Sequence, residues 1–212
     1  PLIHATQVFS GISSRIGDEA WKALKDIVDE TFDDNGIPCE NSPNYHAYWI
    51  SLLEPFAEMS SVWPLRSSPY WFDLSDVVSA ARSALTHFAD HTGAYVPIGD
   101  SHATPSLVTP SRESLLVSEH SGFVCYSYGD TLFTFNCGYT NYAHKHCDDT
   151  SITLAYRGVP LIVDAGYFGH DWRDPRVIYT KSQAAHSGLF LEDFDDLHPG
   201  KLIFPGREVL AS

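Results

Sequence analysis

The sequence predicts an α+β fold in which a helical part comes first and an antiparallel β part follows. Before residue 97, apolar side chains recur at helical spacing in three separate segments. After residue 111, short apolar segments alternate with turn-forming residues, which is typical of β-hairpins. Residues 101–111, which lie between these regions, are rich in Ser, Thr and Pro and show no periodicity. We therefore expect a helical domain over residues 1–100 and a β domain over residues 101–212.

Three helices are predicted in the first part. The first covers residues 18–32 and the second runs from about residue 45 to residue 59, where Pro55 is expected to kink or break it. The third begins after Asp73, a residue that favours the N-cap position, and is expected to end near Gly93, which suits a helix C-terminus.

Two hairpins are predicted in the second part. Tyr128-Gly129-Asp130 has the composition of a turn, and so does the run from Arg157 to Pro160. The strands that flank these turns are expected at residues 122–127 and 131–136, and at residues 151–156 and 161–164.

The composition limits the classes of function. The chain has 212 residues, 43% of them hydrophobic, and a formal net charge of −14. This charge offers no basic footprint for nucleic acid, and no apolar run is long enough for a membrane helix. The four cysteines fit neither a CxxC zinc site nor a dense disulfide scaffold, so we expect buried thiols. An acidic chain binds an acidic polymer only where cations or a metal invert the local field.

The densest cluster of reactive residues lies in the β part. If the backbone is extended from His144 to His146, the two imidazoles point the same way. Asp164 ends an apolar strand, where packing explains a carboxylate poorly, and His186 comes later between small residues. Two histidines and one aspartate are a common set of zinc ligands. The alternative, that each histidine is only a surface or hydrogen-bonded residue, stays open on these residues alone.

A second cluster lies at the entrance to the second predicted helix. Pro43 precedes Tyr45 and His46 there. A tyrosine in this place is either an amphipathic surface residue or a catalytic phenol, and the second reading requires a neighbouring cation that lowers its pKa.

Five runs of residues carry a family resemblance: Asp34-Asn35-Gly36 with Glu40-Asn41-Ser42-Pro43-Asn44-Tyr45-His46; Pro97-Ile98-Gly99-Asp100-Ser101; His144-Lys145-His146-Cys147-Asp148-Asp149-Thr150-Ser151; Arg157 to Gly166; and Arg176 to Thr180 with Ala185-His186-Ser187. In order and spacing they resemble the motifs of the heparinase II/III-like polysaccharide lyases. The resemblance covers about residues 33–190. It implies a partial (α/α) toroid followed by an antiparallel β-sandwich, as a truncated piece of a larger two-domain protein.

The resemblance also implies roles for single residues. Tyr45 corresponds to the catalytic tyrosine and His144 to the histidine that assists proton transfer. His146, Asp164 and His186 correspond to the ligands of a mainly structural zinc. Residues expected to contact an acidic polysaccharide, such as a glycosaminoglycan or alginate, are Glu40, Asn41, His46 and Arg176.

The chain departs from the family pattern in several places. The Asn-His pair expected upstream of Tyr45 is absent, Lys145 replaces a usual Gly, and Ser187 replaces a usual Asn. These departures leave two alternatives to the lyase. One is a relative that binds a polysaccharide without cleaving it, and the other is a zinc hydrolase with Glu40 or Asp148 as its base. Lyases of this type favour a periplasmic or secreted location, and the oligomeric state is open.

Overall fold

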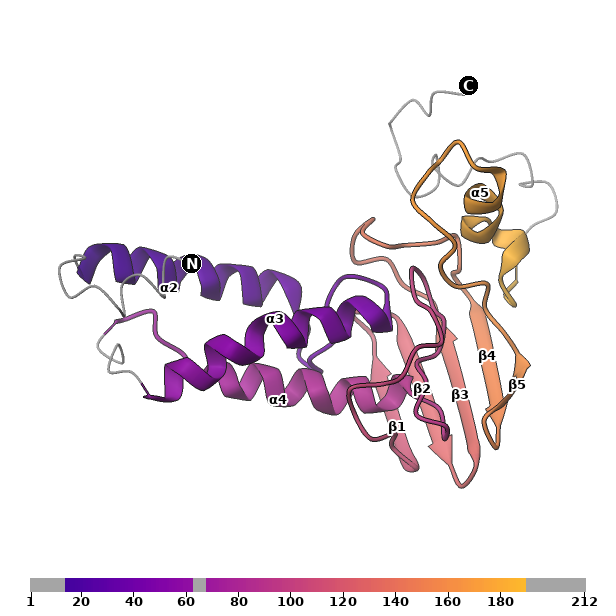
Figure 1. Cartoon of the computed structure of the whole chain (residues 1–212), viewed down its shortest axis with the longest axis horizontal. Helices are drawn as coiled ribbons and strands as arrows, with labels where there is room; N and C mark the ends of the chain where they lie inside the picture. The colour runs from indigo at the N-terminus through magenta and orange to yellow at the C-terminus, as the bar shows by residue number, and fades with distance from the viewer. Residues whose placement is uncertain (1–13, 63–67, 190–212) are drawn as a thin grey trace.

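The computed structural model describes residues 14–62 and 68–189, and begins with three helices (Figure 1). They are α2 (Ser14–Thr31), α3 (Pro43–Val62) and α4 (Leu74–Leu85), which continues into the 3-10 turn η2 (Thr86–Phe88). Helix α3 lies against α4, and their facing sides contribute the buried residues Ile50, Leu53, Leu74, Val78, Ala81 and Leu85. No helix within the described ranges combines the length and apolar character needed to cross a membrane.

The helix boundaries differ from the sequence prediction in two places. Pro55 lies inside α3, and the helix continues past it. Asp73 caps α4 as predicted, because its side chain accepts a hydrogen bond from the Ser75 backbone amide. The third helix ends well before Gly93, however. Gly93 belongs instead to a turn around Asp90, whose carboxylate accepts the backbone amides of residues 92 and 94.

Up to residue 189, the β part forms one antiparallel sheet of five strands in the order β1-β2-β3-β4-β5. Its strands are β1 (Glu113–Ser118), β2 (Phe123–Tyr128), β3 (Thr131–Asn136), β4 (Ser151–Tyr156) and β5 (Val159–Ile162). Both predicted hairpins are present, whereas β1 was not predicted. Strand β5 begins two residues earlier than expected because a two-residue turn precedes it. Arg157 (φ 52°) and Gly158 (φ 72°) both have positive φ there, as a tight hairpin turn requires.

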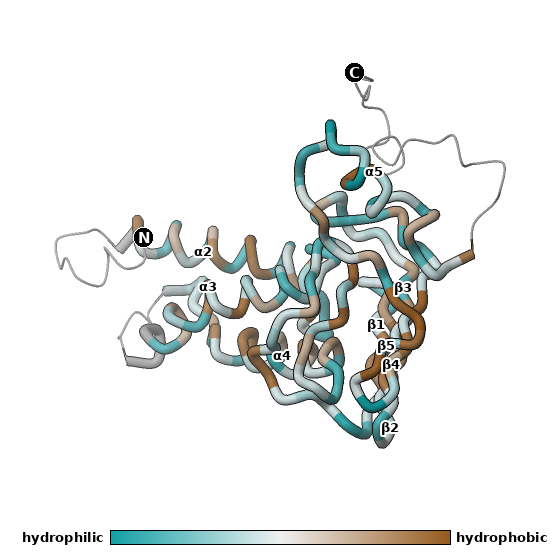
Figure 2. The backbone as a smooth tube through the Cα atoms, turned by 45° about the vertical axis from the view of Figure 1, so that its right-hand side comes forward, coloured by the Kyte–Doolittle hydropathy of each residue, from teal (hydrophilic) through white to brown (hydrophobic). Residues whose placement is uncertain are grey.

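The inner face of the sheet packs on the helical part. Phe88 at the end of the helices meets Phe123 of β2 edge to face, with ring centroids 5.1 Å apart. Cys125 and Leu132 are buried beside them in a hydrophobic core that includes residues of both parts. The outer face carries exposed Leu115 and Tyr126. In Figure 2, hydrophobic and hydrophilic positions are mixed along the sheet.

Three loop regions gather at one end of the sheet, near the beginning of α3 (Figure 1). They comprise residues 97–105, residues 137–150, and the segment that follows β5 and leads to α5 (Pro175–Lys181) and η3 (Gln183–Ala185). The predicted site residues lie in these loops, in α5 or at the entrance to α3, except for His186, which directly follows η3.

Candidate active site and metal centre

Tyr45 and His144 lie face to face, although one comes from the helical part and the other from the β part. Tyr45 is in the first turn of α3, where Pro43 is the first residue of the helix. Its ring stacks on the His144 imidazole with centroids 3.3 Å apart and an interplanar angle of 16°. We call these two residues the proton-transfer pair. His144 has φ 54°, so the predicted extended backbone at this position is wrong.

The His144 imidazole lies between two carboxylates. Its Nδ1 is 3.0 Å from Asp100 Oδ2, and its Nε2 is 3.1 Å from Glu40 Oε2. Burial acts to lower the pKa of His144, but the hydrogen bonds to Asp100 and Glu40 outweigh it and raise this pKa above its ordinary value. The hydrogen bond from His144 in turn lowers the pKa of Glu40, which also accepts from the Trp49 indole. The site therefore favours an imidazolium flanked by ionised carboxylates.

The surroundings of Tyr45 raise its pKa. Burial is the largest cause, and the negative charges of Asp100 and Glu40 add to it. A catalytic Tyr45 was expected to have a lowered pKa, and the structure shows the opposite: its pKa is raised. Tyr45 therefore does not rest as a phenolate. The carboxylates around the pair have more influence on the phenol than the single imidazolium that stacks on it.

Asp100 and Lys181 are central to the site, and neither was among the predicted site residues. Asp100 binds His144 through Oδ2 and His146 through Oδ1, at 2.9 Å from His146 Nε2. The Lys181 ammonium contacts the same Oδ1 and lies 3.1 Å from His146 Nε2. Burial acts to raise the pKa of Asp100, but the donors of His144, His146 and Lys181 lower it well below its usual range.

His146, Asp164 and His186 lie together and are buried, and we call them the metal group. Each of the three offers a ligand atom, and these atoms lie within 4.8 Å of one another. His146 Nδ1 and His186 Nε2 have no hydrogen-bond partner among the described residues. Burial lowers the pKa of His146 despite its hydrogen bond to Asp100, which favours the neutral imidazole that metals bind.

Asp164 holds the second histidine of the metal group. It lies two residues beyond β5, so it follows the strand instead of ending it as predicted. Its Oδ2 is 2.7 Å from His186 Nδ1 and its Oδ1 accepts the Gly166 amide. A carboxylate behind a histidine whose other nitrogen is unpaired is a recurring feature of zinc sites. The donor set of the metal group thus fits Zn²⁺.

For two of the four residues expected to contact substrate, the expectation is wrong because their side chains are buried. His46 is only 2% exposed and packs against Phe88 in the core, where a sugar cannot reach it. Asn41 is buried, and its side-chain amide donates to the backbone oxygens of Cys39, Asn141 and Ala143. It therefore holds the loop that carries His144.

The other two expected contact residues differ in position. Glu40 lies directly beside the proton-transfer pair through its contact with His144. Arg176 is in the exposed first turn of α5, where it pairs with Asp174 and lies over the Phe168 ring. None of the described contacts joins Arg176 to Tyr45 or His144.

Further rings extend from the proton-transfer pair across the loops. His170 lies 6.3 Å from His144, Tyr167 lies 4.9 Å from His170, and His102 lies 5.0 Å from Tyr167, measured between ring centroids. His170 and His102 are exposed and Tyr167 is half-buried. Sugars bind to such rings through their apolar faces. Sequence reasoning missed this row because its members come from different loops.

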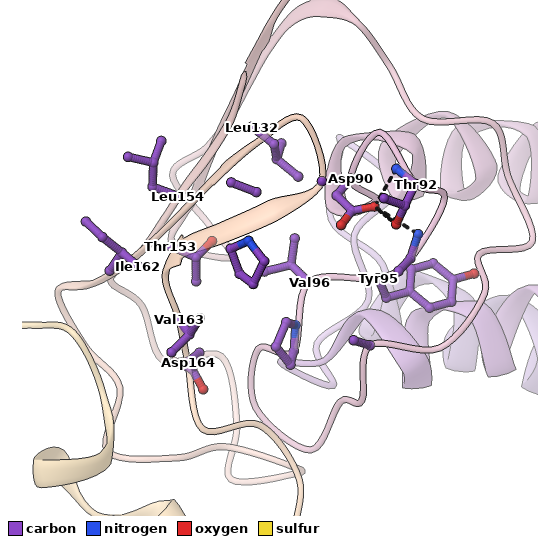
Figure 3. A pocket seen from close by; sticks show the side chains of 16 residues that line it. Asp90, Thr92, Tyr95, Val96, Leu132, Thr153, Leu154, Ile162, Val163 and Asp164 are labelled. Atoms are coloured by element: carbon purple, nitrogen blue, oxygen red, sulfur yellow. Dashed lines mark hydrogen bonds between the residues drawn. The ribbon is translucent and has the colours of Figure 1, made fainter. Parts of the chain in front are cut away.

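An apolar cavity of about 340 Å³ lies between the 90–97 loop and strands β4 and β5 (Figure 3). Leu132, Val96 and Ile162 are among its walls, and Asp164 lies at one end of it. Neither Tyr45 nor His144 lines it. This apolar lining holds few of the polar groups that the loops bring together, so we take the loops as the candidate site.

Comparisons with known proteins concern the family resemblance and the fold of the chain. Residues 110–208 match the model of the family described as heparinase II/III-like, C-terminal. The predicted resemblance to heparinase II/III-like proteins is therefore confirmed for this part of the chain. No curated protein matches the sequence.

Solved structures share the fold at low sequence identity. A heparinase III with methylated lysines superposes with a TM-score of 0.71 at 15% identity, covering 87% of this chain and 34% of its own. A mutant of the heparan sulfate lyase HepC from Pedobacter heparinus gives 0.66 at 16% identity, over 84% of this chain and 34% of its own. Another heparinase III gives 0.67 at 13% identity, over 87% and 37%. The predicted α+β fold class is confirmed, and the chain spans about a third of the length of these structures.

Proposed function

We propose that this chain provides the Tyr45–His144 part of the active site of a polysaccharide lyase that cleaves a uronic-acid polymer by β-elimination. The observation that carries the proposal is the stacked proton-transfer pair, with His144 held between Glu40 and Asp100. A phenol can relay protons, and a protonated imidazole beside it can stabilise negative charge that develops during the reaction.

The elimination removes the C5 proton of a uronate, breaks the bond between C4 and its glycosidic oxygen, and leaves a C4–C5 double bond. The raised pKa of Tyr45 keeps its hydroxyl protonated at neutral pH. We assign a relay to this hydroxyl: its oxygen takes the C5 proton while its own proton passes to the leaving oxygen. Tyr45 gains one proton and loses one, so its hydroxyl is protonated again at the end of the step.

We assign an electrostatic role to His144. Negative charge develops on the uronate carboxylate as the C5 proton leaves, and a fixed cation nearby stabilises it. The raised pKa of His144 keeps the imidazole charged at pH values where an ordinary histidine is largely neutral.

The metal group has a separate place in this proposal. His146, Asp164 and His186 would hold Zn²⁺, which would brace the loops at the end of the sheet and supply no step of the elimination. We also propose a periplasmic or secreted location, which suits an enzyme that degrades extracellular polysaccharide.

A zinc hydrolase is less well supported. That alternative needs a free carboxylate base near the metal group. Asp148 is fully buried, 2.5 Å from the Lys145 ammonium, and accepts a hydrogen bond from Asn136. Glu40 is engaged by His144 and Trp49.

The test is the rise in ultraviolet absorbance of the unsaturated uronate product. Heparan sulfate is the first polymer to try, since one of the structurally similar proteins is a lyase of that polymer. Other glycosaminoglycans and alginate follow. We expect Tyr45→Phe to lower kcat by at least about 100-fold, the usual contribution of general acid–base catalysis, with little change in KM.

The matched control is Tyr128→Phe, because Tyr128 is exposed on the outer face of the sheet. It should leave the rate unchanged. The lyase assignment fails if every uronate polymer stays intact, or if Tyr45→Phe cleaves as fast as the control. Tight binding of a polymer without product formation would favour the non-catalytic alternative.

A further inference from the structure

A single buried carboxylate contacts both histidines of the His144-Lys145-His146 run. Asp100 is 6% exposed, and its two oxygens take different partners. Oδ2 is 3.0 Å from His144 Nδ1 in the proton-transfer pair, and Oδ1 is 2.9 Å from His146 Nε2 in the metal group. Two imidazoles with different proposed roles therefore share one hydrogen-bonding partner.

We propose that Asp100 is a positioning residue that couples the metal group to the proton-transfer pair, so that Zn²⁺ at the metal group changes the hydrogen bonding and orientation of the His144 ring. The roles of the two groups rest on the proposed function. The coupling itself rests on the two contacts of Asp100. Hydrogen bonds to the two oxygens of one carboxylate influence each other, because each withdraws charge from the same group.

The surroundings of His146 explain how a metal would change the contact. A neutral imidazole has one nitrogen that donates and one that accepts. If the proton is on Nδ1, Nε2 accepts a hydrogen bond from the Lys181 ammonium, 3.1 Å away. If the proton is on Nε2, it donates to Asp100 and leaves the Nδ1 lone pair open.

His146 would have to adopt the second arrangement in order to hold a metal ion. Nδ1 has no hydrogen-bond partner in the described part of the chain, whereas Nε2 is occupied. A ligand nitrogen must present its lone pair, so the proton has to lie on Nε2. Asp100 Oδ1 then gains a donor, and the charge available to His144 at Oδ2 falls.

Lys181 stabilises the buried negative charge of Asp100. Its buried ammonium pairs with Asp100, so the carboxylate is compensated whichever tautomer His146 adopts. Replacing Asp100 with Asn removes the second oxygen while keeping the shape. An amide has only one acceptor atom, so it cannot accept from both histidines.

The experiment uses the full chain with ¹⁵N-labelled histidine and follows the ring nitrogen signals by NMR. The His144 signals are assigned by their loss in His144→Gln. Zinc chloride is added to saturation to the wild type, to Asp100→Asn and to Asp130→Asn. The last is a control that removes an exposed carboxylate paired with Arg157. Equilibrium dialysis measures the zinc bound to each protein.

We expect zinc to shift the His144 ring signals in the wild type and in Asp130→Asn. In Asp100→Asn, zinc should still bind, with affinity about 10–100-fold lower because a supporting carboxylate is lost, and the His144 shift should disappear. If Asp100→Asn does not fold, Asp100→Glu keeps the charge that Lys181 requires but displaces both oxygens, and the shift should fall by at least half.

Three outcomes overturn the proposal: an equal His144 shift in the Asp100 variants, no shift in the zinc-loaded wild type, or no zinc bound by the wild type. Uronate cleavage measured on the same wild-type preparation keeps the two questions apart. A chain that cleaves polymer but shows no zinc-dependent shift retains the lyase assignment and loses the coupling.

Discussion

His46 should make the protein lose stability in mild acid. Its side chain is 2% exposed and packs against Phe88, with ring centroids 6.4 Å apart. Burial lowers its pKa from 6.5 to about 3, more than offsetting a hydrogen bond with the Ala81 backbone and the charge of Asp33. The folded protein therefore holds His46 neutral, whereas the unfolded chain protonates it in the ordinary range.

The sign follows from which state binds the proton. A histidine whose folded pKa is depressed leaves stability intact above the unfolded pKa of 6.5, and stability falls as the pH drops from there toward about 3. At pH 5, nearly all unfolded chains and few folded ones carry this proton. With about 1.4 kcal/mol per pKa unit, the free energy of unfolding should fall by about 2 kcal/mol between pH 8 and pH 5.

The assay is urea unfolding at pH 8 and pH 5 for the wild type and His46→Gln. The substitution itself lowers the free energy of unfolding at both pH values because it disturbs packing. For each protein we therefore compare only the change in the free energy of unfolding between pH 8 and pH 5. Its loss of stability should be smaller than that of the wild type by about 2 kcal/mol. His120→Gln, at an exposed position, should behave as the wild type does. If His46→Gln and the wild type lose equal stability within about 0.5 kcal/mol, His46 is not the cause.

Two further predictions concern the loops and the metal group. Gly99→Ala should lower the free energy of unfolding, measured with urea, by about 1–3 kcal/mol and should lower the rate of polymer cleavage. Gly99 has φ 55°, and a Cβ there would lie 2.4 Å from the backbone oxygen of Asn41. An unchanged urea midpoint would contradict this prediction. Zinc at about 100 times its Kd should raise the free energy of unfolding by about 2.7 kcal/mol and raise Tm. An excess of chelator should reverse both effects. His186→Ala should remove this response, whereas a zinc-induced rise that persists in the variant would place the metal elsewhere.

Local sequence patterns predicted the three long helices and both hairpins, but neither β1 nor α5, and not all of the boundaries. Helical periodicity located α2, α3 and α4, and the turn residues located both hairpins. Pro55 was expected to disturb α3, but the helix continues because its packing against α4 outweighs the local cost of proline. Gly93 resembled a helix C-terminus, whereas the Asp90 side chain forms a turn there by accepting backbone amides.

Within the candidate site, sequence reasoning found the residue types more reliably than their partners. An alternating pattern predicted that His144 and His146 face the same way through extended backbone. They instead meet the two oxygens of Asp100 from a loop in which His144 has positive φ. The argument that singled out Asp164, a carboxylate that packing explains poorly after an apolar run, applies equally to Asp100 after Val96-Pro97-Ile98 and would have found it.

The site exists only where the helical and β parts meet, and the polar contacts across that boundary explain its form. Asn41 donates from the entrance of α3 to backbone oxygens at residues 141 and 143. Ser42 shares a hydrogen bond with Ser101 at 2.7 Å, and Gly99 lets the backbones of Asn41 and His144 approach each other. A buried residue such as Asn41 therefore affects chemistry without touching substrate, because it sets where His144 lies relative to Tyr45. The expected domain division after residue 100 separates Tyr45 from His144, so the proposed reaction would require both parts of the chain.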